Sequence, residues 1–170
     1  MICPTCGFDN LPGNEECANC QQDLTPLDRP TAQDRVERSL MEDEVALLHP
    51  KAPVTIRPDT TVQSAIQVML EHDIGALLVV DSRGKLLGIL SERDLLAKVA
   101  GLHGNYTELP VAPFMTANPE TVTTTDTLDF VLHKMDGGGY RHLPVLLGDR
   151  PIGVVSVRDM LRHITRMCKD

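Results

Sequence analysis

Apolar and polar positions alternate in two successive patterns over most of the chain. The first, over residues 54–100, predicts five elements: a strand at 54–56, a helix from 62 to 70, two strands of a hairpin at 76–80 and 86–90, and a helix from 91 to about 100. Thr60 and Gln63 form a capping-box pattern before the first helix. The second helix is expected to turn Leu95, Leu96 and Val99 toward the core.

The same elements recur further along the chain. The second set is a strand at 121–123, a helix with Leu128, Val131, Leu132 and Met135, a hairpin over 141–155, and a last helix with Met160, Leu161, Ile164 and Met167 inward. The three glycines at 137–139 are expected to form a loop. Gly88–Asp94 matches Gly153–Asp159 position by position, with Gly, two aliphatic residues, Ser, Arg and Asp aligned. Because one copy of about 55 residues offers only a thin core, two copies packed sheet to sheet should form the folding unit.

The segment before the repeats divides into a connector and a helix. Residues 21–34 are polar and contain Pro26 and Pro30, which indicates a connector. A helix is expected from about Thr31, as its N-cap, to Leu48, ending before Pro50. Its apolar face holds Val36, Leu40 and Leu47.

Four of the five cysteines stand close to the N-terminus as two C-x2-C pairs: Cys3, Cys6, Cys17 and Cys20. Two tight turns of this kind supply the four thiolates of a tetrahedral Zn²⁺ site, and metal binding would stabilise a segment with almost no core. A redox motif would need a surrounding βαβ domain, and disulfides are disfavoured in the cytoplasm, the compartment expected for a chain without a basic, apolar leader. The segment resembles zinc-ribbon modules that begin Cys-Pro-x-Cys-Gly, although Gln21 follows the second pair where Gly is usual.

Composition narrows the classes of partner. Apolar residues make up 42% of the chain and aromatic residues 3%, so the core must be aliphatic. The net charge of −8 argues against nucleic-acid binding, and no apolar run is long enough to cross a membrane. Residues 1–28 contain five acidic residues and no Lys or Arg, so the zinc module is expected either to contact another protein or to serve only as a folded cap.

The order of elements and the duplicated Gly-aliphatic-x-Ser-x-x-Asp motif, with Leu143-Pro144-Val145 in the second copy, resemble the CBS family, whose tandem pair is called a Bateman module. The resemblance implies an α+β fold of two tandem βαββα repeats packed as a pseudo-two-fold pair. The expected divisions are a zinc ribbon at 1–22, a linker and helix at 23–49, a first repeat at 50–105 and a second at 106–170. CBS pairs commonly form dimers through their helices, so a homodimer is expected.

Each Ser-x-x-Asp motif has two interpretations. It is a capping-box pattern at a helix start, but its repetition at the end of a strand also favours an anion site at the helix N-terminus. The CBS resemblance implies an adenine-nucleotide ligand (AMP, ADP or ATP), or less often S-adenosylmethionine. It implies Asp94 and Asp159 at ribose, Ser91, Arg93, Ser156 and Arg158 on the phosphate side, Thr55, Ile56, Val122 and Thr123 along the base pockets, and Ala76, Leu77, Arg141, His142 and Pro144 on the opposite wall. The other histidines are expected to be solvated: His49, His72, His103, His133 and His163.

The sequence contains no known catalytic motif, and four thiolates would leave zinc no open position for chemistry. We therefore expect a regulatory protein that senses a nucleotide and signals to an unknown protein partner. The alternatives are a structural or adaptor module without ligand, and a nucleic-acid regulator gated by ligand.

Overall fold

The computed structural model describes residues 1–11, 13–25, 32–99 and 105–169. It divides the chain into two compact units, Met1–Arg38 and Ser39–Asp170, which are described separately. Among the helices described, none is long and apolar enough to span a bilayer.

The first unit is built around the cysteines and has little other core. Isolated antiparallel bridges join Ile2 to Asp9 and Glu16 to Asp23, so each cysteine pair sits in its own hairpin-like turn. Cys3, Cys17 and Leu24 are the buried residues at its centre. With so few apolar contacts, the fold of this unit depends on the cysteines.

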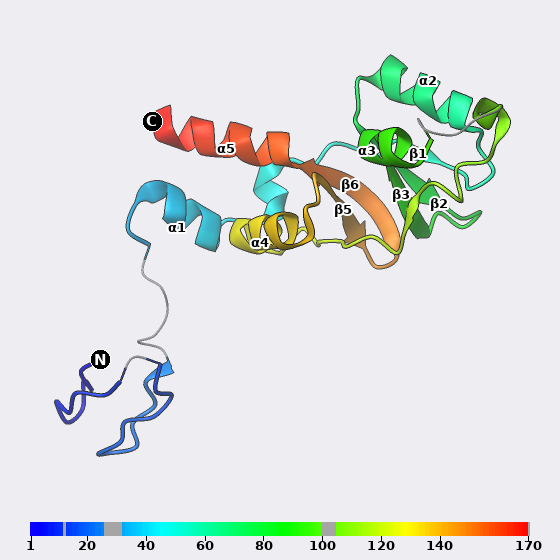
Figure 1. Ribbon diagram of the computed structural model, residues 1–170. Coiled ribbons are helices and arrows are strands. Elements are labelled where there is room, and N and C mark those ends of the chain that lie inside the picture. The colour runs from blue at the N-terminus through cyan, green and yellow to red at the C-terminus, as the bar shows by residue number, and fades with distance from the viewer. Residues whose placement is uncertain (12, 26–31, 100–104, 170) are drawn as a thin grey trace. The chain divides into compact units, whose positions relative to one another are not determined.

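The second unit contains the two repeats (Figure 1). The first repeat has strand β1 (Thr55–Ile56), helix α2 (Val62–His72), strands β2 (Ala76–Val80) and β3 (Leu86–Ser91), helix α3 (Glu92–Asp94) and π-helix η3 (Leu95–Val99). The second has α4 (Leu128–Gly138), β5 (His142–Leu147), β6 (Arg150–Ser156) and α5 (Val157–Lys169). Helix α1 (Arg35–Glu42) and two 3-10 helices, η2 (Val45–Leu48) and η4 (Tyr106–Glu108), lie outside these sets.

Sheet pairing follows the duplication. In the first sheet β1 runs parallel to β2, β2 antiparallel to β3, and β3 antiparallel to β4 (Thr116–Ala117). In the second sheet β5 and β6 form an antiparallel hairpin. The prediction of a mixed α+β pair is confirmed, and Ala76, Leu78 and Ile89 pack with Val154 of β6, which joins the two sheets. The expected strand at 121–123 is reduced to one parallel bridge between Val122 and Val145.

The two repeats exchange the segments that precede them. The Val45 amide donates to the Asp126 carbonyl at 2.9 Å, and the fully buried Val45 side chain packs into the core of the second repeat. At the corresponding place before the second repeat, the Val111 amide donates to the Thr60 carbonyl at 2.8 Å, and the buried Val111 packs into the core of the first repeat. Each repeat therefore closes its core with a residue that precedes the other.

The same exchange continues at the sheet edges. Lys51 pairs with Val154 of β6, and Thr116 pairs with Ile89 of β3, again at matching positions of the duplication. Neither sheet could extend this way from its own repeat alone, so the pair is the folding unit, as predicted from the thin core of a single copy.

The single helix predicted from Thr31 to Leu48 is wrong. The chain forms α1 and then η2, because the Asp43 carbonyl accepts from the Leu128 amide and Glu44 bridges to Thr127 instead of continuing the helix. Leu47, expected on the buried face, is 47% exposed. The proposed N-cap, Thr31, lies outside the described residues, as do Pro26 and Pro30.

Several local predictions also change. The N-cap of α2 is Thr61, whose side chain accepts from the Ser64 amide, because Thr60 Oγ1 instead accepts from the Arg57 amide. Two of the three glycines at 137–139 are helical, and only Gly139, with φ of +63°, ends α4 as its C-cap.

The burial of three helix residues differs from the prediction. Leu96 and Leu161, expected to face inward, are 73% and 59% exposed. His163, expected to be solvated, is buried on the inner face of α5 and lies 2.7 Å from Ser39 Oγ. His103 lies outside the described residues.

The exchange of segments predicts the effect of a small substitution. Val45→Ala should lower the free energy of unfolding by about 1.5 to 3 kcal/mol, because it removes buried methyl groups and leaves a cavity in the second repeat. Val111→Ala should have a similar effect on the first repeat. Leu47 is exposed on η2, the 3-10 helix that also contains Val45, so Leu47→Ala should change the free energy of unfolding by less than about 0.5 kcal/mol. Denaturant unfolding of the three variants measures this, and equal, small effects of Val45→Ala and Leu47→Ala would contradict it.

Candidate functional site

The cysteines lie in two turns with the same hydrogen bonds. The Cys3 amide donates to the Phe8 carbonyl and the Gly7 amide to the Cys3 carbonyl, both at 2.9 Å. In the second turn the Cys17 amide donates to Gln22 and the Gln21 amide to Cys17, both at 2.8 Å. The fifth position of each turn has a left-handed backbone, with φ of +72° at Gly7 and +60° at Gln21. Gln21 thus adopts the conformation that glycine takes in the first turn, at some cost in strain.

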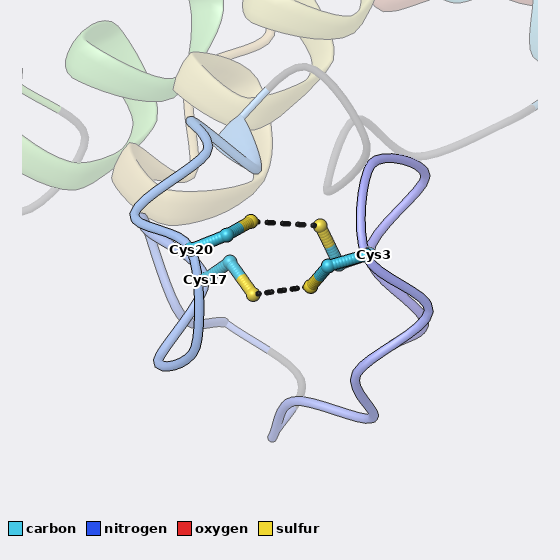
Figure 2. Close-up of side chains that lie close together, drawn as sticks. Cys3, Cys17 and Cys20 are labelled. Atoms are coloured by element: carbon cyan, nitrogen blue, oxygen red, sulfur yellow. Dashed lines mark hydrogen bonds between the residues drawn. The ribbon is translucent and has the colours of Figure 1, made fainter.

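The four sulfur atoms converge on one point (Figure 2). Cys3 Sγ lies 3.7 Å from Cys20 Sγ, and Cys6 Sγ lies 3.6 Å from Cys17 Sγ, with all four within 4.8 Å of one another. A disulfide needs sulfurs about 2.05 Å apart, so these contacts are not disulfides. Four sulfurs at about 2.3 Å from a tetrahedral ion lie about 3.8 Å from each other. The cluster therefore has the dimensions of a four-thiolate metal site.

Surrounding amides favour the thiolate form of Cys17, whereas at Cys20 the backbone hydrogen bond from Gln22 is outweighed by the neighbouring sulfurs and by burial, which raise its pKa. The buried Asn10 donates from its side chain to Cys17 Sγ at 3.5 Å, and its oxygen accepts from the Ala18 amide. Burial alone would raise the pKa of Cys17, but hydrogen bonds from the Cys20 and Asn19 amides and from Asn10 lower it to about 6. A thiolate at this position is the form that binds metal.

The first Ser-x-x-Asp motif is a complete capping box between β3 and α3. Asp94 Oδ2 accepts from the Ser91 amide at 2.9 Å and from Ser91 Oγ at 2.6 Å, while the Asp94 amide donates to Ser91 Oγ at 3.2 Å. The other carboxylate oxygen, Oδ1, accepts from Lys98 Nζ at 2.7 Å and from Thr116 Oγ1 at 3.1 Å. Burial opposes the charge on Asp94, but the hydrogen bonds from Lys98 and Ser91 outweigh it and lower its pKa.

The second motif has the same local geometry and different surroundings. Asp159 Oδ2 accepts from the Ser156 amide at 2.9 Å and from Ser156 Oγ at 2.6 Å. Asp159 Oδ1 has a single long contact among the described residues, to Arg162 Nη1 at 3.5 Å. This carboxylate lines a cavity of about 160 Å³, whose other walls are Leu47, Leu48, His49, Pro50, Lys51, Val154, Val155, Arg162, His163 and Arg166.

The glycine of each motif permits the exchanged segment to cross it. A Cβ atom at Gly153 would lie 2.6 Å from Pro50 Cβ, and one at Gly88 would lie 2.6 Å from Met115 Sδ and 2.9 Å from the Thr116 carbonyl oxygen. A Cβ atom at these separations would clash with the rigid Pro50 ring or with the Thr116 backbone, so Gly fits where the segments cross. In each motif, the glycine lies where the exchanged segment crosses the strand, and the serine and aspartate cap the helix that follows.

Both capping boxes use helix amides that were expected to be free for an anion. The Glu92 amide donates to the Gly75 carbonyl and the Val157 amide to the Arg141 carbonyl, both at 3.0 Å. The backbone amides of Asp94 and Asp159 donate to the hydroxyl groups of Ser91 and Ser156. A phosphate at either motif would therefore depend on side chains for most of its contacts.

His142 lies where the two repeats meet. Its ring contacts the Gly75 backbone, since a Cβ atom on Gly75 would lie 3.3 Å from His142 Cε1 and 3.1 Å from Glu92 Oε2. Burial lowers the pKa of His142; Arg141 and Arg158 lower it further, and Glu92 and Asp159 act against them. His142 pairs with Ser156, and the Arg141 carbonyl accepts from the Val157 amide, so the backbone at both residues lies beside the second motif.

Other predicted site residues lie apart from the motifs. Thr55 and Ile56 pair with Leu78 and Val79, on the side of β2 away from β3. Val122 is buried in the core of the second repeat, and the exposed Thr123 donates its amide to Asp126. Ala76 pairs with Ser91 and His142 with Ser156, so these two residues do lie beside the motifs.

Three further placements complete the predicted set. Leu77 is buried in the core of the first repeat, and the buried Pro144 accepts from the Val122 amide. The Arg93 guanidinium approaches Gly139, the C-cap of α4, which brings a basic group of the first repeat to a loop of the second.

The residues that actually reach the motifs come from the exchanged segments and from the helices that follow. They are Pro50 and Lys51 at Asp159, Thr116 at Asp94, and Lys98 and Arg162 one turn along each helix. Sequence reasoning missed Lys51 and Thr116. Lys51 and Thr116 are as far apart in sequence as Asp94 and Asp159, so they occupy matching positions of the duplication. This spacing could have identified them from the sequence.

The sequence profile of the CBS domain matches this chain twice, over residues 40–101 and 111–166. The chain belongs to the CBS domain family. Its first match begins at residue 40, before β1, and so includes the segment that closes the core of the second repeat.

Relatives and solved structures agree with this assignment. An uncharacterized 17.7 kDa protein from Acidianus ambivalens is 34% identical over 114 residues, which is 64% of this chain and 65% of that protein. The crystal structure of a CBS-domain protein from Agrobacterium tumefaciens is 33% identical, with a TM-score of 0.65 over 70% of this chain and 94% of that one. The CBS domain pair of protein MJ0100, in complex with 5′-methylthioadenosine and S-adenosyl-L-methionine, is 26% identical, with a TM-score of 0.66 over 72% and 96% of the two chains.

The shared region is only part of the curated relatives. The chain spans 65% of the Acidianus protein and 20% to 22% of three CBS domain-containing proteins from Arabidopsis thaliana. The likeness therefore concerns the CBS pair, and the cysteine unit at residues 1–38 lies before the matched ranges.

Proposed function

We propose that this CBS pair is a regulatory module that binds an adenine nucleotide at Asp159 and passes the bound state to a protein partner. The observation that carries the proposal is the free side of the Asp159 carboxylate, which lines a cavity and has only one long protein contact among the described residues. A carboxylate held in this way can accept hydrogen bonds from the two hydroxyls of a ribose.

The surroundings of Asp159 match the other parts of a nucleotide. Leu48, Pro50 and Val154 line the same cavity as Asp159 and give it apolar surface of the kind that suits a purine base. His142 pairs with Ser156, the Arg141 carbonyl accepts from the Val157 amide, and Arg158 directly precedes Asp159. These basic residues flank the second motif and are the proposed contacts for phosphate. In a chain of net charge −8, such a group of basic side chains favours an anionic ligand.

A solved structure supports an adenosine-containing ligand. Both ligands in the MJ0100 structure contain adenosine, and that CBS pair is 26% identical to this one. The cavity of about 160 Å³ is smaller than the roughly 300–1,000 Å³ of sites that enclose a whole ligand, so a nucleotide bound at Asp159 would lie partly outside it.

Calorimetric titration of the full chain with AMP, ADP, ATP and S-adenosylmethionine tests the proposal. At least one nucleotide should bind, and Asp159→Ala should weaken it about tenfold or more, because charged hydrogen bonds to ribose are lost. Asp149→Ala, an exposed carboxylate in the β5–β6 turn, is the matched control and should leave the affinity unchanged. Unchanged binding in Asp159→Ala would refute the site, and binding of S-adenosylmethionine alone would refute the phosphate contacts.

Absence of binding by all four compounds would favour the second function, an adaptor that contacts protein without a ligand. The observation that favours this function is the acidic N-terminal segment, residues 1–28, which contains no Lys or Arg. The same charge disfavours the third function, nucleic-acid binding, because phosphates would be repelled.

We also propose that the four-cysteine cluster of the first unit holds a structural Zn²⁺. The sulfur separations of 3.6 and 3.7 Å match a tetrahedral thiolate shell, and four protein ligands leave no position open for chemistry. The full chain purified under reducing conditions should contain about one zinc per chain by elemental analysis. Cys17→Ser should remove most of this zinc, whereas Cys168→Ser, an exposed thiol on α5, should retain it. Equal zinc contents in the two variants would contradict the site.

We propose that a second copy of the chain covers the exposed leucines Leu96 and Leu161. Leu96 and Leu161 occupy matching positions in the two repeats and are 73% and 59% exposed, so a two-fold dimer could cover both at once. Light scattering should give a mass near twice 18.7 kDa for the full chain. Leu161→Glu should shift the mass toward one chain, while Leu147→Glu, an exposed leucine in the β5–β6 hairpin, should not. A wild-type mass near 18.7 kDa would refute the dimer.

A further inference from the structure

The two Ser-x-x-Asp motifs make the same hydrogen bonds within the capping box and differ in the contacts of one carboxylate oxygen, Oδ1. Both serines bond to Oδ2 of their aspartate at 2.9 Å from the amide and 2.6 Å from the hydroxyl. The backbone and the inner half of each carboxylate are therefore held in the same way. Any difference in function between the motifs must come from Oδ1, the oxygen that the capping box leaves free.

In the first motif this oxygen is already satisfied by the protein. Lys98 Nζ donates to Asp94 Oδ1 at 2.7 Å and also to the Phe114 carbonyl at 2.8 Å. Thr116 Oγ1 donates to the same Oδ1 at 3.1 Å. Two donors, an ammonium and a hydroxyl, thus occupy the oxygen of Asp94 that a ribose would need.

The second motif lacks this arrangement among the described residues. His163 stands at the position that matches Lys98, and it contacts Ser39 Oγ at 2.7 Å and Asp43 at 3.8 Å instead of Asp159. Lys51 stands at the position that matches Thr116 and lines the cavity. As a result 29% of the Asp159 side chain is exposed, against 12% of the Asp94 side chain.

A ligand at the first motif would have to displace charged contacts. Lys98 links η3 to Asp94 and to the segment before β4, so a ribose that bonded to Asp94 would break the ion pair and leave the ammonium without these partners. Each charged hydrogen bond lost weakens binding by about tenfold or more. At the second motif, a ligand displaces only the 3.5 Å contact from Arg162.

We infer that Lys98 is an internal occupant of the first motif, so that each chain binds one nucleotide, at Asp159, and Asp94 serves to hold the structure together. This inference rests on the proposed function and specifies which of the two motifs carries it. The two motifs therefore have the same sequence pattern and different roles. The Asp94 motif links η3 to the exchanged segment, and the Asp159 motif remains open to ligand.

Calorimetry with AMP on the full chain distinguishes the two motifs. Wild type should bind one AMP per chain. Asp94→Asn should bind it with an affinity within about twofold of wild type, whereas Asp159→Asn should lose about tenfold or more. These two substitutions preserve side-chain volume, so they are informative even if removal of Lys98 prevents folding.

Lys98→Met provides the positive test, because it keeps the aliphatic stem and removes the ammonium. Combined with Asp159→Asn, it should restore binding of one AMP per chain, and adding Asp94→Asn should abolish that binding again. Two AMP molecules per wild-type chain, loss of binding in Asp94→Asn alone, or no restored binding in a folded Lys98→Met, Asp159→Asn chain would overturn the inference while leaving the proposed function in place. No binding of any of the four compounds to wild type would overturn both.

Discussion

Each repeat of this chain is unable to close its own core, and the structure depends on how the other repeat supplies the missing residue. Val45 precedes the first repeat and is buried in the second, and Val111 precedes the second repeat and is buried in the first. Backbone hydrogen bonds hold both valines in place, to Asp126 and Thr60. A single βαββα copy would leave an apolar opening where its valine should be, which is why the duplication folds as a pair.

The same exchange builds the candidate ligand sites. After supplying its valine, each crossing segment passes over the glycine of the opposite motif, at Gly153 or Gly88, and reaches the helix that follows. Pro50 and Lys51 arrive beside Asp159, and Thr116 arrives beside Asp94. The two sites are thus composed of residues from both repeats. At matching positions, Lys98 donates to Asp94, whereas His163 contacts Ser39 instead of Asp159.

Much of the fold could be predicted from local pattern. The hairpins and the helices α2 and α4 follow directly from periodicity, and the duplicated motif identified both capped helix starts. The break between α1 and η2 could not be predicted in this way, because it results from the Leu128 amide donating to the Asp43 carbonyl and from the Glu44–Thr127 bridge, which join residues distant in sequence. The exposure of Leu96 and Leu161 likewise depends on how each helix packs in the pair, which periodicity alone does not determine.

The candidate sites divide in a similar manner. The four cysteines and the two Ser-x-x-Asp motifs are local patterns with fixed spacing, and the structure brings the members of each together. The family resemblance implies that Thr55 and Val122 line the ligand, and the structure pairs them with β2 and β5 on the sides away from β3 and β6. Lys51 and Thr116 come from the crossing segments instead, and only the tertiary exchange shows that they reach the aspartates.

A crystal structure of the full chain grown with AMP tests most directly which motif binds the nucleotide. We expect one nucleotide per chain, with its ribose hydroxyls hydrogen-bonded to Asp159 and its phosphate toward Arg141, His142 and Arg158, while Lys98 remains on Asp94. A nucleotide bonded to Asp94, with Lys98 displaced, would contradict this expectation.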